Sequence, residues 1–515
     1  MLELIRQNLL TLLIFLPLVG AIAVLLTRSA TAARNATLIS TGVLLALSLL
    51  LLVPGVFDST TPGAYAYADA GGVVQLVQRV AWIPSIKAEY LVGVDGLSLP
   101  LVVLSSLLFL LATVSSKIQR QPRAFYALML LLQTGVTGSF LALDLLLFFV
   151  FFELALLPMY FLIGIWGGQR REYAAIKFFI YTFAGSIAIL VALIAIYLKV
   201  GSFDLIALPA LLKSTAGSTW AMVMFLLLLV GFLVKLPAMP LHTWLPDAHV
   251  EAPTPVSMIL AGVLLKLGGY GVLRIAMPLF PEVAVALWWL IAIIAVTSIV
   301  AGALCAMGQT DFKRLVAYSS VSHMGFVLLG AGMMTHAAVT GAVFMMVAHG
   351  LTSAAMFAVV GVISDRVHHR DLNRLGGLTT SMPGYSRLAV LFIFASLGLP
   401  GLCNFIGEML VLLGTFNAAG NGPLSSVAPD WAIYTIAGLA TFGIVLTAGY
   451  MLWALQRVYL GEPTTETAQL PDLTSSESLT LWPLGVLAVA LGVLPWPLVL
   501  TYSDTTIAAL LQVMS

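Results

Sequence analysis

The sequence predicts an all-α membrane protein whose chain crosses the bilayer many times. It has 515 residues, of which 61% are hydrophobic and only 9% are charged. Soluble domains carry about 25% charged residues, so most of this surface must face lipid or other apolar side chains. Crossing a bilayer takes about 20 consecutive apolar residues, and stretches of that length recur along the whole sequence.

Fourteen of these stretches are expected to be transmembrane helices. They lie near residues 8–27, 36–54, 96–116, 123–141, 143–166, 174–198, 219–240, 254–278, 283–307, 313–333, 338–364, 387–417, 431–456 and 480–502. The first is expected to be a retained span rather than a signal peptide, because no clear cleavage site follows it. Residues 55–94 are rich in Gly, Ala and Tyr, and residues 461–478 in Thr, Ser and Glu. Both segments are expected to be nonhelical and exposed.

Lysine and arginine predict the orientation, because cytoplasmic loops carry an excess of them. Of the 23 such residues, fifteen fall in loops that follow odd-numbered spans. Six fall on the other side: Arg6, Arg79, Lys87, Lys199, Lys213 and Arg274. We therefore expect both termini outside and the basic loops in the cytoplasm, which agrees with an even number of spans.

Four charged residues interrupt the apolar spans near their middles, together with two histidines. Ionisable groups at membrane depth are rare and usually face a bundle interior or a water path. The alternatives are an ion pair that only packs helices, or a lysine that snorkels to the interface. Finding several such residues together favours a function, and the set is Glu153, Lys235, Lys266, His323, His349 and Glu408. Asp144, at the start of its span, is expected to be interfacial instead.

Proline and glycine interrupt two of the spans that carry these charges. Pro237 and Pro240 follow Lys235, and their missing N–H groups free the carbonyls of Leu233 and Leu236. Free carbonyls at membrane depth need protein or water as partners, so we expect a hydrated cavity beside Lys235. A kink filled by a neighbouring helix is the alternative.

The second interruption, at Pro400 and Gly401, precedes Glu408 and lies five spans after the first. Paired interruptions in two halves of a chain are typical of transporters built from inverted repeats. The sequence therefore predicts two inverted five-helix repeats, at residues 119–281 and 282–460, with broken helices 7 and 12. Residues 1–118 would hold the first three spans, and residues 461–515 a polar loop, the last span and a tail.

The charged set suits proton transfer. Glu153 and Lys235 could form a gate, in which the lysine keeps its proton only while the carboxylate is close. Lys266, His323 and His349 could form a relay, because histidine exchanges protons near neutral pH. Each histidine alone could also be an ordinary packing residue.

Several kinds of chemistry find no support in the sequence. It has no phosphate-binding P-loop and no dinucleotide-binding glycine motif. Cys305 and Cys403 are the only cysteines, too few for an iron–sulfur cluster or a disulfide framework. The net charge of +1 gives no broad basic face for nucleic acid. We therefore expect no metal site and no cofactor site on this chain.

Four motifs resemble one family closely. "HTWLPDAHVEAPTPVSMILAGVLLKLGGYG" (242–271), "DFKRLVAYSSVSHMGFV" (311–327), "FFELALLPMYFLIGIWGG" (151–168) and "LGLPGLCNFIGEMLVL" (397–412) are similar to signatures of the antiporter-like subunits of proton-pumping NADH:quinone oxidoreductase, respiratory complex I. The resemblance spans about residues 95–460. Large subunits of Mrp-type cation/proton antiporters share the same core. Among the complex I paralogues, a glutamate at Glu408 and the short C-terminus resemble the M type, the counterpart of mitochondrial subunit 4.

The resemblance implies a role for each residue of the set. Glu153 and Lys235 would be the gating pair, Lys266 the central relay, His323 and His349 relay histidines, and Glu408 the terminal proton site. The chain would translocate protons outward across a bacterial inner (plasma) membrane. FMN, iron–sulfur clusters and quinone would bind in partner subunits, and the L- and N-type paralogues would be neighbours. A subunit of an Mrp-type antiporter and a non-pumping scaffold are the alternatives.

Overall fold

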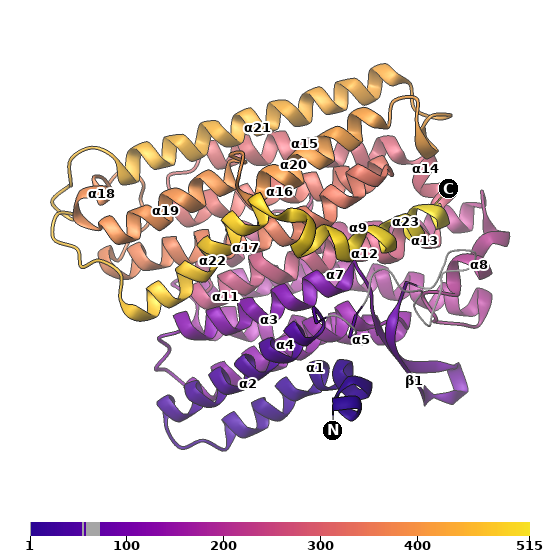
Figure 1. Cartoon of the computed structure of the whole chain (residues 1–515), viewed down its shortest axis with the longest axis horizontal. Coiled ribbons are helices and arrows are strands. Elements are labelled where there is room, and N and C mark those ends of the chain that lie inside the picture. The colour runs from indigo at the N-terminus through magenta and orange to yellow at the C-terminus, as the bar shows by residue number, and fades with distance from the viewer. Residues whose placement is uncertain (1, 54–55, 58–72, 515) are drawn as a thin grey trace.

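The computed structural model describes residues 2–53, 56–57 and 73–514 and shows a bundle of long helices (Figure 1). Twelve of the described helices are long and apolar enough to cross a membrane, which confirms the predicted all-α polytopic fold class. Of the fourteen predicted spans, the seventh and the twelfth do not form a single helix long enough to cross a membrane. Helix α9 has 17 residues, and the twelfth is divided into pieces of 14 and 15 residues. The count of fourteen therefore stays a prediction.

The N-terminal part contains three long helices and a hairpin. Its elements are α1 Leu2–Leu25, α2 Ala30–Leu50, β1 Gln75–Ile83, the short 3₁₀ turn Pro84–Ile86, β2 Ala88–Val94 and α3 Ser98–Ser115. The two strands pair antiparallel. Leu91, Val92 and Val94 of β2 are fully buried, so the expectation that this segment is exposed was wrong for β2. Residues 54–55 and 58–72 of the same segment lie outside the described residues.

The helices of the two predicted repeats follow. The first group is α4 Pro122–Leu141, α5 Leu145–Leu154, α6 Leu156–Trp166, α7 Arg171–Val200, α8 Leu208–Leu212, the 3₁₀ turn Lys213–Thr215, α9 Thr219–Lys235, α10 Trp244–Glu251, α11 Thr254–Ile259, the π turn η3 Leu260–Leu264, α12 Leu265–Gly271, the π turn η4 Val272–Ala276 and α13 Met277–Leu279. The second is α14 Pro281–Ala286, α15 Trp288–Met307, α16 Phe312–Met333, α17 His336–Val367, α18 Leu378–Ser381, α19 Pro383–Ser396, α20 Cys403–Asn417, the 3₁₀ turn Gly422–Leu424 and α21 Asp430–Tyr459.

The same backbone device begins one helix in each group. Asp144 caps α5 by accepting the N–H of Leu147, and a backbone bridge joins it to Asp204. Asp311 caps α16 in the same way and is bridged to Asp371. The first bridge lies at the end of the bundle that holds β1 and α8, and the second at the end that holds α18 (Figure 1). Equivalent devices at opposite ends of the bundle are what inverted repeats produce.

The two helix breaks also match in detail. After α9, the N–H of Leu236 bonds to Phe232 and that of Ala238 bonds to Leu233. After α19, the N–H of Leu397 bonds to Ile393 and that of Leu399 bonds to Phe394. Each broken helix thus ends with one ordinary turn and one wider turn, which pulls the chain out of the helix.

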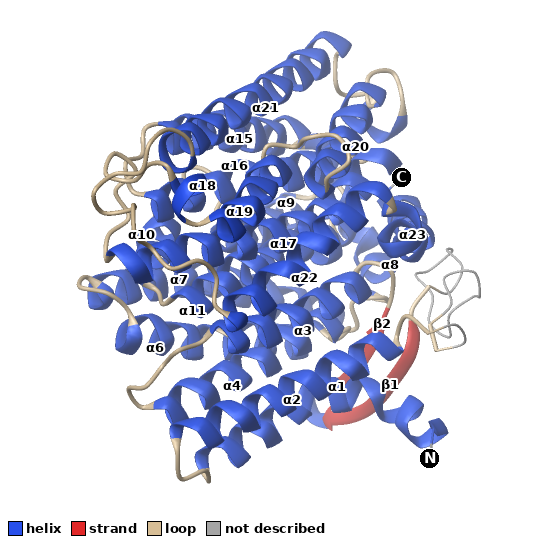
Figure 2. Cartoon of the chain, turned by 60° about the vertical axis from the view of Figure 1, so that its left-hand side comes forward, coloured by secondary structure: helices blue, strands red, loops and turns tan. Residues whose placement is uncertain are grey.

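The centre of the bundle is formed by α17 and by the helix that runs from α11 to α13 (Figure 1). The apolar windows of both are entirely buried, whereas that of α21 on the rim is 28% buried. Both termini lie toward the end of the bundle that carries the β-hairpin (Figures 1 and 2). The central pair is therefore shielded from lipid by the remaining helices.

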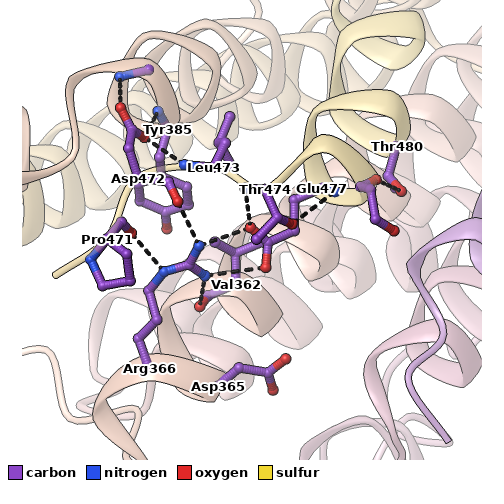
Figure 3. Close-up of polar contacts among 12 residues, drawn as sticks. Val362, Asp365, Arg366, Tyr385, Pro471, Asp472, Leu473, Thr474, Glu477 and Thr480 are labelled. Carbon is purple, nitrogen blue, oxygen red and sulfur yellow. Dashed lines mark hydrogen bonds and ion pairs between the residues drawn. The ribbon is translucent and has the colours of Figure 1, made fainter.

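The C-terminal part is α22 Ser475–Val493, the π turn Trp496–Leu500 and α23 Thr501–Met514. Residues 461–474 are nonhelical, as expected, but residues 475–478 of the same segment begin α22. Thr467 and Glu477 are buried, so the expectation of exposure was wrong there. Arg366, at the end of α17, donates to both carboxylate oxygens of Glu477, at 2.8 and 3.2 Å, and to the carbonyls of Pro471 and Asp472 (Figure 3). Thr474 and Glu477 form a capping box. This clamp ties the loop and α22 to the end of α17.

Candidate functional site

The residues predicted to act together come from six different helices. Those helices are α5, α9, α12, α16, α17 and α20, which carry Glu153, Lys235, Lys266, His323, His349 and Glu408 in that order. Lys266 is 0% exposed, and the last three and Lys235 are 2–3% exposed. Glu153 is half-buried. Charged groups in such surroundings are stable only when other polar groups contact them.

Lys266 and the two histidines form the middle of the site. Lys266 Nζ lies 2.8 Å from His349 Nδ1 and donates to the carbonyl of Ala261, in the π turn η3. The ring centroids of His349 and His323 are 5.2 Å apart. His349 Nε2 has no hydrogen-bond partner among the described residues. A second polar partner, such as a water, can therefore join the relay at this atom.

His323 is surrounded by acceptors. Its Nδ1 lies 2.8 Å from the carbonyl of Ser319, and its Nε2 lies 2.9 Å from the carbonyl of Ser396. A neutral imidazole has one N–H donor, whereas an imidazolium has two. Glu408 Oε1 lies 3.7 Å from the same Nε2. His323 and Glu408 are therefore close enough to exchange a proton directly or through one water.

Glu408 sits against the second helix break. Gly398 has φ +79°, and a Cβ at that position would collide with the Glu408 carboxylate. Only glycine combines this left-handed backbone with that close approach. Pro400 and Gly401 complete the break. The break therefore leaves space for the Glu408 carboxylate beside Ser396, whose carbonyl contacts His323.

Glu153 and Lys235 are neighbours, but the structure does not join them in an ion pair. Lys235 Nζ lies 4.7 Å from the ring centroid of Phe152, the residue beside Glu153. The field of each charged group acts on the other. Ser186 is a polar neighbour of Glu153, yet neither its hydroxyl nor Glu153 Oε1 completes a hydrogen bond within the described chain. The arrangement is that of two opposite charges that act on each other without forming an ion pair, with an aromatic ring beside the lysine.

The first break is filled by protein at several points. The carbonyl of Leu233 accepts the N–H of Ala238 at 3.0 Å, and that of Val234 accepts Trp244 Nε1 at 2.9 Å. Ser298 on α15 accepts the N–H of Met239. The prediction that proline frees the carbonyl of Leu233 was therefore wrong, because the chain turns back and supplies a donor there.

Three polar residues near the site were not predicted. His249 and Lys313 are 0% and 5% exposed. Arg274 was expected in an external loop, but it is buried in η4 and pairs with Asp95. Asp144, expected at the interface, is also buried, and it accepts the N–H groups of Leu147 and Glu89.

Metal ligation is not supported by the described part of the chain, which contains no group of three or more His, Cys, Asp or Glu side chains that could hold an ion. The site is instead a row of acid–base side chains. Lysine, histidine and glutamate can each hold and release one proton.

Comparison with known proteins places this row in a family. The family profile described as NADH:quinone oxidoreductase/Mrp antiporter, TM, matches residues 142–427. NADH-quinone oxidoreductase subunit M of Rhodobacter capsulatus is 41% identical over 507 residues, covering 95% of this chain and 94% of the relative. The chain belongs to the family of NADH-quinone oxidoreductase subunit M. The corresponding protein of Rickettsia felis is 38% identical, over 94% of both chains.

Solved structures agree with this family membership. A chain of the respiratory complex I from Thermus thermophilus superposes with a TM-score of 0.84 at 28% identity, covering 98% of this chain and 99% of that one. A chain of the Mrp complex from Dietzia has a TM-score of 0.81 at 22% identity and covers 98% of this chain. The second match shows a shared fold only. The resemblance seen in the four motifs is confirmed.

Proposed function

We propose that this chain is a proton-translocating membrane subunit of NADH:quinone oxidoreductase and moves protons outward through the six-residue row. The observation that carries the proposal is the buried series of contacts from Lys266 through His349 and His323 to Glu408. Each neighbouring pair can exchange a proton, directly or through one water, and lipid is kept out by the surrounding helices. Redox chemistry in partner subunits drives the transfer.

Each residue has one task in this scheme. Glu153 and Lys235 are the gate: movement of the carboxylate toward Lys235 holds the lysine proton, and separation across Phe152 releases it. Lys266 receives protons at the centre, and the two histidines pass them on. Glu408 is the terminal site, from which the proton leaves on the outer side.

The setting of the chain follows from the same proposal. It is a multi-pass subunit of a bacterial inner membrane, with both termini outside and the basic loops in the cytoplasm. Its partners are the other membrane subunits of complex I, above all the L- and N-type paralogues, and membrane lipids. FMN, iron–sulfur clusters and quinone belong to partner subunits, and none binds here. The bridged pairs Asp144–Asp204 and Asp311–Asp371 support repeat boundaries at residues 119–281 and 282–460.

The Mrp-type antiporter is the second candidate, because its fold is the same. The subunits that copurify with the chain separate the two candidates. NADH- and quinone-binding partners support the complex I subunit, and a complex without them, which exchanges sodium for protons, supports the antiporter.

Replacement of Lys235 tests the proposed function. In the assembled complex, Lys235→Ala should lower proton pumping by at least about tenfold, because a proton carrier contributes 10²–10⁴-fold to a transfer step. Lys235→Arg should also fail, since arginine keeps its proton in proteins. Pumping is measured as acidification of sealed vesicles during NADH oxidation. Glu153→Gln, which keeps the shape and removes the charge, should impair pumping in the same direction.

A scaffold role makes the opposite forecast for these variants. A complex that assembles with Lys235→Ala and still pumps at the full rate would remove the proposal. If Glu153→Gln pumps at a near-normal rate and Glu153→Ala does not, Glu153 is a packing residue and the proposed gate is contradicted.

Glu408 gives a second test through the order of two substitutions. Glu408→Gln fits the space beside Gly398 but cannot carry the charge, so pumping should fall about a hundredfold. Glu408→Lys fits less well but can carry a proton, so it should retain part of the activity. Pumping rates and infrared difference spectra of carboxyl protonation measure the two effects. A packing role predicts the reverse order, with the glutamine variant active and the lysine variant damaged.

A further inference from the structure

A polar pocket opens between the two repeats at the end of the bundle where the basic loops lie. Its volume is about 790 Å³. Glu251 and Ala252 line it from the first repeat, and Asp311, Lys313 and Gly361 from the second. This end is the cytoplasmic one in the proposed orientation, so water in the pocket would be in contact with the cytoplasm.

Lys313 projects from the wall of this pocket but is itself 95% covered. It is 5% exposed, and its Nζ donates to the carbonyl of Ala252. No carboxylate forms an ion pair with it within the described residues. The carboxylates of Asp311, Glu251 and Asp365 act on it only without direct contact. Burying a lysine without a direct ion pair is expensive, so a packing role alone explains it poorly. Its small exposed part is within reach of water in the pocket.

His249 lies deeper, behind the same wall. It is fully buried, and its ring stacks on Phe357 at a centroid distance of 4.3 Å. Neither ring nitrogen has a hydrogen-bond partner within the described residues. Phe357 is one turn of α17 from Gly361, which lines the pocket. Buried polar atoms without protein partners usually contact an unseen water, and His249 has two such atoms.

His249 lies near the pocket wall, because Lys313 Nζ donates to the carbonyl of Ala252, three residues after His249. The two cations whose fields reach it are Lys313, on the pocket wall, and Lys266, at the relay centre. His249 in turn acts on His349. Lys313, His249 and Lys266 are thus three proton-carrying groups in series, each within electrostatic range of the next.

We propose that Lys313 and His249 form the proton-uptake station of this subunit and carry protons from the cytoplasmic pocket to Lys266. The inference rests on the proposed function, because it supplies the proton that the relay moves. A cytoplasmic proton, carried by water in the pocket, protonates neutral Lys313, which passes the proton to a ring nitrogen of His249 through a water. His249 gives it to neutral Lys266 and returns to the uncharged form. Each transfer returns its donor to the uncharged form and charges its acceptor, so a single positive charge moves from Lys313 to Lys266, which the relay then discharges.

Two substitutions keep the packing and remove only the transfer. Lys313→Arg keeps the charge and a donor for the Ala252 carbonyl, but arginine does not release its proton. His249→Phe keeps a ring to stack on Phe357 but has no nitrogen. Both complexes should assemble, and proton pumping per assembled complex should fall at least about tenfold, as expected for loss of an acid–base group.

The matched control is Lys117→Met. Lys117 lines the same pocket, but its side chain is 54% exposed and pairs with Glu477 and Asp365. The exposed pair with Asp365 contributes about 0–1 kcal/mol, and Glu477 keeps Arg366 as its partner, so this variant should pump at close to the normal rate. Lys266→Met, measured in parallel, reports on the relay itself.

The outcomes separate this inference from the proposed function. Loss of more than half of the pumping in both Lys313→Arg and His249→Phe, with Lys117→Met unaffected, supports the uptake station. Pumping above half of the normal rate in either variant overturns it, because the group concerned is then only structural. If Lys266→Met also pumps normally, both the uptake station and the proposed function fail. If Lys266→Met is inactive while Lys313→Arg and His249→Phe pump normally, only the uptake station fails, and protons reach the relay by another path.

Discussion

Replacement of Lys266 with methionine is expected to lower proton pumping and coupled NADH oxidation by about a hundredfold, the contribution expected of a central acid–base group. Methionine has nearly the length of lysine but no N–H donor. It would leave the Ala261 carbonyl without its hydrogen-bond donor and His349 Nδ1 without a neighbour that can give it a proton. Rates of NADH oxidation and vesicle acidification, divided by the amount of assembled complex, give the effect.

Two further variants show whether this loss of pumping comes from the missing proton carrier. Lys266→Arg keeps a buried positive charge and donors but does not deprotonate, so it should be inactive although the complex assembles. Lys199→Met, at an exposed lysine near the end of α7, should be normal. An active Lys266→Arg complex would mean that a fixed charge suffices and that Lys266 carries no proton.

The second large effect is on stability, at the ion pair between Asp95 and Arg274. The two side chains are 0% and 1% exposed. Asp95 also accepts the N–H groups of Leu97 and Ser98 at the start of α3, and Arg274 Nε donates to the hydroxyl of Tyr270. Removing one partner of a buried pair costs about 3–5 kcal/mol, because the other charge is left uncompensated. Asp95→Asn should therefore lower the unfolding temperature and the yield of assembled complex.

A neutral pair should restore part of this loss. Asp95→Asn combined with Arg274→Gln leaves no uncompensated charge, so its thermal unfolding in detergent should lie above that of Asp95→Asn alone. Asp430→Asn, at an exposed acid in the first turn of α21, is the control and should change nothing. An unfolding temperature of Asp95→Asn equal to that of the unchanged complex would contradict the account.

The helices and the row of charges could be predicted because each leaves a local signal. An ionisable residue inside an apolar run, as at Lys235 or Glu408, is conspicuous wherever the chain folds. The contacts between them could not be predicted, since they join helices far apart in sequence. The bond from His323 to the Ser396 carbonyl, for example, depends on where the second break places that carbonyl.

The errors have physical causes as well. Arg274 follows Lys266 and Tyr270 at four-residue steps, so it lies on the same helix face, but its place near the end of a span made a loop position plausible. Lys313 adjoins Arg314 in a basic segment. Only the fold shows that the Lys313 side chain is buried and donates to the carbonyl of Ala252. Proline was expected to leave Leu233 unpaired, yet the wider turn after α9 brings the N–H of Ala238 to that carbonyl.

The central claim is that protons cross this subunit through Lys266 and its neighbours. It is tested most directly by counting protons released per NADH oxidised, in sealed vesicles that contain the Lys266→Met complex. Slow turnover does not disturb this ratio, provided that the rates of the compared samples are matched with a partial inhibitor of NADH oxidation. The account predicts a ratio below that of the unchanged complex, because the NADH oxidation that remains in the variant proceeds without proton transfer through this subunit. An unchanged ratio would show that protons do not pass through Lys266.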